Sequence, residues 1–138
     1  MANTYTVEQA KELYAEAVRL KLLRTENLAD AELVAAVCNG IGAAWMPDFM
    51  RKLADKLSPA MRFAAAIHDV DYERGGDESD RLAADVIFLG NALLVTDLEY
   101  AWYNPMRYIM RARAKRYYEY LRTCGGKAFK AKQEEAKA

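Results

Sequence analysis

The only histidine of the chain, His68, lies in an alanine-rich segment close to a carboxylate and a tyrosine. If residues 58–74 form a helix, His68 and Tyr72 share one face, and Asp69 lies roughly 100° around the axis. The other residues on the face of His68 are small or apolar, namely Met61, Ala64 and Ala65. An imidazole with one ring nitrogen held by a carboxylate can accept a proton from water at the other nitrogen. The pattern therefore indicates a general base for hydrolysis.

The carboxylate that would hold His68 can be located by counting across the turn at Gly75 and Gly76. A second helix is expected at about 77–103, and a short glycine turn makes two such helices antiparallel. Residues 68 and 85 then lie level with each other. Asp85 falls inside the apolar stripe expected on this helix, where an unpaired carboxylate is costly. That stripe consists of Leu82, Val86, Leu89 and Leu93. We therefore expect Asp85 to bind and orient His68.

A calcium site can be assembled around Asp69, whose carboxylate would lie beside the reacting group. Calcium prefers oxygen ligands, which carboxylates and backbone carbonyls supply. A Gly-x-Gly loop can turn carbonyls inward because glycine tolerates the required dihedral angles. Cys38, Gly40 and Gly42 form such a loop. The alternative interpretation of these two glycines is a helix C-cap followed by a turn.

Three segments resemble the phospholipase A2-like superfamily. Residues 68–72 (His-Asp-Val-Asp-Tyr) resemble its His-Asp-x-x-Tyr motif. Residues 84–88 (Ala-Asp-Val-Ile-Phe) resemble the Ala-Asp-x-x-Phe element of its compact parvoviral and prokaryotic or prophage-encoded branch. Residues 39–42 (Asn-Gly-Ile-Gly) are similar to the glycine-rich calcium loop. The resemblance covers about residues 38–91 and does not include the flanking helices.

The resemblance implies Ca²⁺-dependent hydrolysis of the sn-2 ester of a phospholipid, with a phospholipid or membrane surface as the transient partner. His68 would be the general base, Asp85 its orienting partner and Tyr72 a supporting hydrogen-bond donor. The calcium ligands would be the Asp69 carboxylate and three backbone carbonyls, those of Cys38, Gly40 and Gly42. The calcium ion and the Gly40 amide would stabilise the oxyanion. The alternative function is a catalytically silent, phage-associated module that keeps the His/Asp/Tyr network for packing or partner binding.

The elements that must position these groups are all helical. Apolar residues recur at three- and four-residue spacing without β-branched alternation, which predicts an all-α, compact bundle of about six helices around the hairpin. The length of 138 residues suits a single domain at 1–130, followed by a disordered tail at 131–138. The helices are expected at about 6–24, 31–38, 47–57, 58–74, 77–103 and 105–124. Thr6, Ser58 and either Asp77 or Ser79 are suitable N-caps, a short helix follows Asp30, and Gly125 and Gly126 are expected to end the last helix.

The composition favours no charged macromolecule as a partner. Hydrophobic residues make up 53% and charged residues 29%, and the formal net charge is zero. Nucleic acid is therefore not expected as a partner, and the oligomeric state is not defined by the sequence. The sequence has no recognisable signal peptide or transmembrane segment, and two cysteines do not make a disulfide framework. We expect a cytoplasmic or phage-associated protein.

Two groups of residues allow both a core and a surface interpretation. Near the glycine loop, one group either packs in the core or forms a lipid-facing rim: Trp45, Met46, Phe49 and Met50. The tyrosines and arginines of residues 105–124 suit an amphipathic helix with its aromatic side in the core, or an interfacial surface for anionic lipid. The acidic residues near the glycine turn are expected to be solvated; these are Asp71, Glu73, Asp77, Glu78 and Asp80.

Overall fold

The computed structural model describes residues 5–38 and 47–137 and confirms the all-α prediction. Within these ranges the chain forms six α-helices and one short 3₁₀ helix, with no β-strand. In chain order the elements are α1 (Val7–Arg19), η1 (Thr25–Leu28), α2 (Ala31–Val37), α3 (Asp48–Ala54), α4 (Met61–Arg74), α5 (Glu78–Glu99) and α6 (Pro105–Lys137). None of the helices in the described ranges combines the length and the apolar character that crossing a membrane requires.

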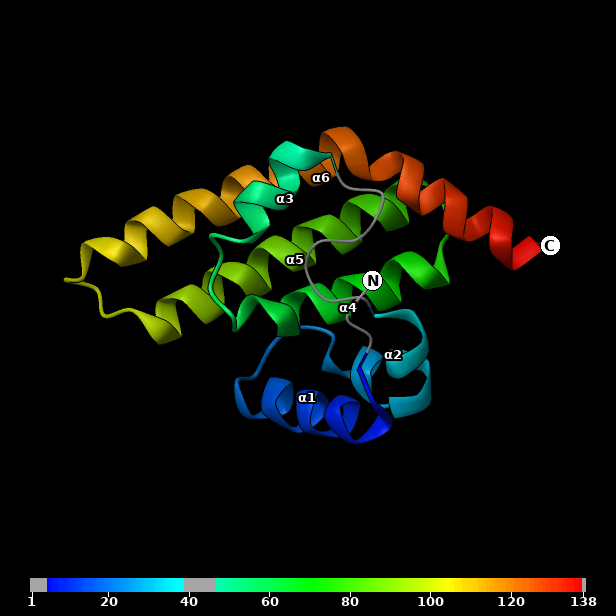
Figure 1. The fold of residues 1–138 in the computed structure, drawn as a ribbon, viewed down its shortest axis with the longest axis horizontal. Helices are drawn as coiled ribbons and strands as arrows, with labels where there is room; N and C mark the ends of the chain where they lie inside the picture. The colour runs from blue at the N-terminus through cyan, green and yellow to red at the C-terminus, as the bar shows by residue number, and fades with distance from the viewer. Residues whose placement is uncertain (1–4, 39–46, 138) are drawn as a thin grey trace.

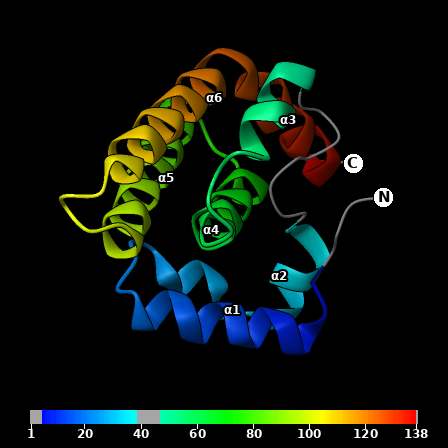
Figure 2. The same ribbon diagram turned by 60° about the vertical axis from the view of Figure 1, so that its left-hand side comes forward.

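The helices are arranged in layers around α4. In Figure 1, α4 and α5 lie between α1 and α2 on one side and α3 and α6 on the other. Figure 2 shows α4 in the middle of the other helices. Ten of the 14 residues of α4 are buried. A helix that is buried almost all round belongs to the core of the molecule, and α4 is the helix that carries His68 and Asp69.

A tight turn joins α4 to α5 and makes them an antiparallel pair. Gly75 and Gly76 have φ values of 73° and 128°, which glycine adopts without the steric cost of a side chain. Asp77 then caps α5, and its side chain accepts a hydrogen bond from the backbone N–H of Asp80. The Asp80 carboxylate in turn accepts a hydrogen bond from the backbone N–H of Asp77, which completes a capping box. The hairpin expected from the sequence is therefore present.

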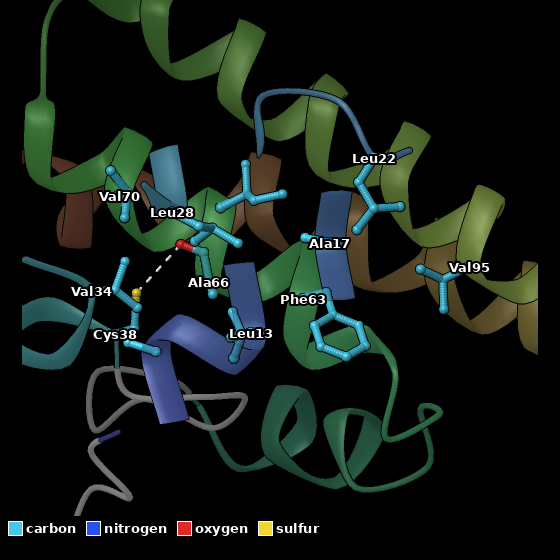
Figure 3. Close-up of a cluster of buried hydrophobic side chains, with 12 residues drawn as sticks. Leu13, Ala17, Leu22, Leu28, Val34, Cys38, Phe63, Ala66, Val70 and Val95 are labelled. Atoms are coloured by element: carbon cyan, nitrogen blue, oxygen red, sulfur yellow. Dashed lines mark hydrogen bonds between the residues drawn. The ribbon is translucent and has the colours of Figure 1, made fainter. Parts of the chain in front are cut away.

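One hydrophobic cluster joins the N-terminal elements to α4. Figure 3 shows Leu13 and Ala17 of α1, Leu28 of η1 and Val34 of α2 gathered around the α4 side chains. The buried Cys38 lies at the end of α2, and its thiol donates a hydrogen bond to the backbone carbonyl of Ala66 at 3.4 Å. The end of α2 is thus held against the middle of α4.

A second cluster packs α3, α4, α5 and α6 together. Its fully or nearly fully buried members include Met50, Met61, Phe88, Tyr117 and Leu121. Small residues at the contacts, such as Ala64, Ala92 and Ala114, let these helices approach closely. This cluster fixes the position of α6 relative to the α4–α5 hairpin.

Asp71 is buried, and the prediction that it belongs to a solvated acidic surface is wrong. Only 5% of the residue is exposed. Its Oδ1 atom accepts a hydrogen bond from Asn27 at 2.9 Å and forms ion pairs with Arg24 and Arg74, both at 3.1 Å. A buried carboxylate is retained where such partners are available. In this case they come from the η1 region as well as from α4, so sequence spacing on one helix could not reveal them.

The helix α6 does not end at Cys124, Gly125 and Gly126, as the sequence predicted, but continues to Lys137. It therefore includes residues 131–137, which were predicted to be a disordered tail. Two consecutive glycines have low helix propensity. Tertiary packing overrides that preference, because Gly125 is buried where α6 crosses the α4–α5 hairpin.

The buried face of α5 also differs from the predicted stripe. Leu82 and Val86 are 44% and 49% exposed. The buried positions are Arg81, Ala84, Asp85, Phe88, Asn91, Ala92, Val95 and Thr96. Apolar residues occur on several sides of α5, so their spacing alone could not select the core face. Asp85 is nevertheless buried, as expected from its place in the helix.

Candidate functional site

The expected contact between His68 and Asp85 is present at the centre of the α4–α5 hairpin. His68 Nε2 lies 2.7 Å from Asp85 Oδ1. The Tyr72 hydroxyl donates a hydrogen bond to the same carboxylate oxygen at 2.8 Å. Asp85 is fully buried, and only 7% of the His68 side chain is exposed. Three side chains that could form a hydrolytic site therefore meet in a nearly dry environment.

Aromatic rings hold the imidazole of His68 on two sides. The ring centroid of Tyr72 lies 4.2 Å from that of His68, and the centroid of Phe88 lies 5.5 Å away with its plane inclined by 64°. Such ring contacts restrict rotation of the imidazole. Because the bond to Asp85 uses Nε2, Nδ1 is the ring nitrogen at which a proton could be exchanged.

The second oxygen of Asp85 is bound by an arginine that the sequence analysis did not identify. Arg122 of α6 donates a hydrogen bond from Nη1 to Asp85 Oδ2 at 2.6 Å. Arg81 lies on the same side, with its Nη1 3.6 Å from Oδ2. Glu78 accepts hydrogen bonds from both guanidinium groups, at 2.9 Å from Arg81 and 2.8 Å from Arg122. A charged layer therefore covers the side of Asp85 that faces away from His68.

Arg81 also fixes the backbone of α6 next to the site. This arginine is 7% exposed, and its Nη1 donates a hydrogen bond to the carbonyl of Leu121 at 3.1 Å. Its Nη2 donates to the carbonyl of Arg122 at 3.4 Å. The i,i+4 spacing of Arg81 and Asp85 was visible in the sequence and could have revealed this partner. No comparable signal pointed to Arg122, because it lies 37 residues beyond Asp85.

The electrostatics of the site keep Asp85 ionised. Burial acts to raise the pKa of Asp85, but hydrogen bonds from His68, Tyr72 and Arg122 outweigh it, so the net shift is downward. Burial and the adjacent Asp85 charge raise the pKa of Tyr72, which therefore stays a neutral phenol that donates its proton. Hydrogen bonds from Arg81 and Arg122 lower the pKa of the exposed Glu78 to about 2.

The structure gives only part of the expected calcium site. Asp69 is partly exposed on α4, and Cys38 ends α2 against Ala66, one turn of α4 before Asp69. Burial raises the pKa of both Tyr5 and Tyr117, and the negative charge of Asp69 adds to the shift in each case. Gly40 and Gly42 lie outside the described residues. Within 5–38 and 47–137, no three histidine, cysteine or acidic side chains form a group able to hold a metal ion.

The residues considered for lipid contact do not share one environment. Met50 is fully buried in the cluster of α3, α4, α5 and α6, which agrees with the core interpretation of this residue and not with the lipid-facing one. Phe49 is 50% exposed and makes an edge contact with Tyr120 at 4.8 Å between ring centroids. Trp45 and Met46 lie outside the described residues. The short helix α3 contributes two buried residues, Met50 and Ala54, to that cluster.

Comparisons of the chain with protein-family models, with curated proteins and with solved structures found no match. Function is therefore inferred from the side chains around Asp85. Those side chains form a histidine–carboxylate dyad, supported by one tyrosine and closed on its far side by arginines.

Proposed function

We propose that this protein is a Ca²⁺-dependent, phospholipase A2-like ester hydrolase in which the His68–Asp85 dyad activates water. The observation that supports this most directly is the 2.7 Å contact between His68 Nε2 and a fully buried carboxylate oxygen, with the Tyr72 hydroxyl on the same oxygen. These are the roles that the sequence resemblance implies for the three residues. The proposed substrate is a phospholipid, which the protein would bind at a membrane surface. The proposed location of the protein is cytoplasmic or phage-associated.

The proposed reaction uses the two ring nitrogens of His68 in different ways. Nδ1 accepts a proton from water as the water oxygen forms a bond to the ester carbonyl carbon. Asp85, held in its ionised form, stabilises the resulting imidazolium through Nε2. The proton then passes to the leaving alcohol as its C–O bond breaks, which releases a fatty acid and the free alcohol. Tyr72 keeps Oδ1 of Asp85 aligned throughout.

The proposed calcium ligands are the Asp69 carboxylate and the carbonyls of Cys38, Gly40 and Gly42. A hard cation suits an oxygen ligand set of this kind. When bound, calcium would supply positive charge for the oxyanion that develops on the ester carbonyl, together with the Gly40 amide. The fit is supported by the closeness of the end of α2 to the middle of α4, which the Cys38–Ala66 contact fixes.

One observation favours the alternative function, a catalytically silent module. Asp85 Oδ2 faces two guanidinium groups, Arg122 at 2.6 Å and Arg81 at 3.6 Å. Such guanidinium groups compensate the charge of a buried carboxylate, as a purely structural ion-pair network requires. In this alternative the network fixes the packing of α4, α5 and α6, and the module binds a partner without chemistry.

Calcium titration by calorimetry, followed by hydrolysis of mixed phospholipid vesicles, distinguishes the two functions. We expect the wild-type protein to bind calcium and to release fatty acid only in its presence. Asp69→Asn should lose both properties, and His68→Asn should lose hydrolysis while it keeps calcium. Asp55→Asn is the matched control, because Asp55 is an exposed carboxylate at the end of α3. No calcium binding at millimolar concentration would contradict the hydrolase and favour the silent module.

A further inference from the structure

The two oxygens of the Asp85 carboxylate have separate sets of partners. Oδ1 is bound by His68 and Tyr72, both from α4. Oδ2 is bound by Arg122, which comes from α6 and is 25% exposed at its side chain. The remaining side of the Arg122 guanidinium is held by Glu78, since Nη2 donates to that carboxylate at 2.8 Å.

A carboxylate that is bound at both oxygens cannot rotate about its Cβ–Cγ bond without breaking hydrogen bonds. A charge-assisted bond at 2.6 Å is short and strong, so it is the main restraint on the Oδ2 side. Arg81 is a weaker restraint, because its 3.6 Å separation from Oδ2 exceeds hydrogen-bond distance. Its donors are also engaged by Glu78 and by the α6 backbone. The orientation of the carboxylate is therefore held by Tyr72 on the Oδ1 side and chiefly by Arg122 on the Oδ2 side.

We propose that Arg122 is a positioning residue for the His68–Asp85 dyad. It fixes the orientation of the Asp85 carboxylate and, through it, holds the imidazole of His68 as the tautomer with the proton on Nε2. The catalytic consequence rests on the proposed hydrolase function, but the tautomer of His68 can be observed in the absence of any activity. If Arg122 has this role, α6 is part of the candidate site, although it lies outside the segments that resemble the phospholipase motifs.

The residues around Arg122 hold it in place for its contact with Asp85. Arg81 donates hydrogen bonds to the carbonyls of Leu121 and of Arg122 itself, so the backbone that carries the guanidinium is anchored to α5. Gly125 is buried one turn further along α6, next to the Tyr72 hydroxyl and to Arg81. The absence of a side chain at that position lets α6 approach closely enough for Arg122 to reach Asp85.

The tautomer can be read from the ¹⁵N chemical shifts of the histidine ring, because His68 is the only histidine in the chain. We expect one dominant tautomer, protonated at Nε2, in the wild-type protein. Arg122→Gln should give a mixture of the two neutral tautomers, in which the shifts of the two ring nitrogens move toward each other while their mean stays the same; protonation of the ring would lower the mean instead. Arg122→Lys should lie between them, because lysine offers a point charge without the planar fork of arginine. Arg116→Gln is the control, since Arg116 is exposed on the same helix.

The same variants are then tested for calcium-dependent hydrolysis of phospholipid vesicles. For Arg122→Gln we expect kcat to fall about tenfold at an unchanged KM, which is the lower end of the losses seen when the partner that orients a metal-binding side chain is removed. A wild-type tautomer in folded Arg122→Gln would overturn the proposal. If that variant does not fold, a wild-type tautomer in Arg122→Lys would overturn it instead. A tautomer change in a protein without hydrolysis would refute the proposed function but support the positioning role.

Discussion

Gly125 of α6 lies directly against the hydroxyl of Tyr72 on α4, and a Cβ atom at position 125 would be only 2.7 Å from that oxygen. The same hydroxyl donates a hydrogen bond to Asp85. The space that a side chain would occupy is thus taken by one of the groups that hold the carboxylate. Contact between α6 and the α4–α5 hairpin therefore depends on glycine at this position.

Alanine substitutions at the two adjacent glycines of α6 should have opposite effects. Gly126→Ala should stabilise the protein by up to about 1 kcal/mol, because alanine has the higher helix propensity and its Cβ would meet only Arg81, at 3.9 Å. Gly125→Ala should destabilise it by about 1–3 kcal/mol, since the new methyl group displaces Tyr72 from Asp85. Urea unfolding measures both values, and a stabilising Gly125→Ala would show that Tyr72 can move without cost.

Asp85→Asn should be among the most damaging single changes in the chain. The carboxylate is fully buried and neutralises arginines that would otherwise keep an uncompensated charge. Removing one partner of such a buried arrangement typically costs about 3–5 kcal/mol. Asp97→Asn is the matched control: Asp97 pairs with Arg107 and Arg111 but is 30% exposed, so its loss should cost roughly 1 kcal/mol or less. Equal losses in the two variants would contradict the central role of Asp85.

The stability of the protein should fall in acid partly through Asp85. Its pKa is lower in the folded protein than the roughly 3.9 of an unfolded aspartate, so its contribution is complete above that value. The contribution is lost as the pH falls through the lower folded pKa. Glu78, with a pKa of about 2, changes stability in the same direction. Urea unfolding of wild type and Asp85→Asn across pH 2–7 isolates the Asp85 part, and we expect the difference between them to shrink below about pH 4. A constant difference would contradict the assignment.

The orientation of α5 can be tested with two apolar residues. Phe88 is 2% exposed and contacts the imidazole of His68, so Phe88→Ala should cost about 3–5 kcal/mol. Leu82 is 44% exposed, so Leu82→Ala should cost less than about 1 kcal/mol. Thermal or urea unfolding gives both values. A larger loss of stability for Leu82→Ala than for Phe88→Ala would mean that the face of α5 predicted from the sequence is the buried one.

The features that were predictable from the sequence are those that depend on neighbouring residues. Thr6, Asp30 and Asp77 cap helices, because capping is decided within three or four residues. The prediction that Ser58 caps the next helix is wrong, since α4 begins at Met61 after Ala60. The contact between His68 and Asp85 could be located because only a short turn separates their helices. The expected function of these residues stays a prediction.

The features that could not be predicted from the sequence depend on contacts between segments that are distant along the chain. The arginine that binds Asp85 comes from α6, and the partners of Asp71 come partly from the η1 region. The sequence predicted that the last helix ends at Gly125, because nothing in the neighbouring residues indicates that this glycine packs against Tyr72. Periodicity placed Leu82 in the core because it does not show which side of a generally apolar helix another helix will cover.

The dependence of Asp85 on Arg122 imposes an order on folding during protein synthesis. Asp85 is made 37 residues before its guanidinium partner. At about 5–20 residues per second, the interval is roughly 2–7 s. During that time the α4–α5 hairpin has Arg81 but lacks the 2.6 Å bond that holds Oδ2. We therefore expect the hairpin to remain loosely packed on the nascent chain, and the site to close only when α6 docks.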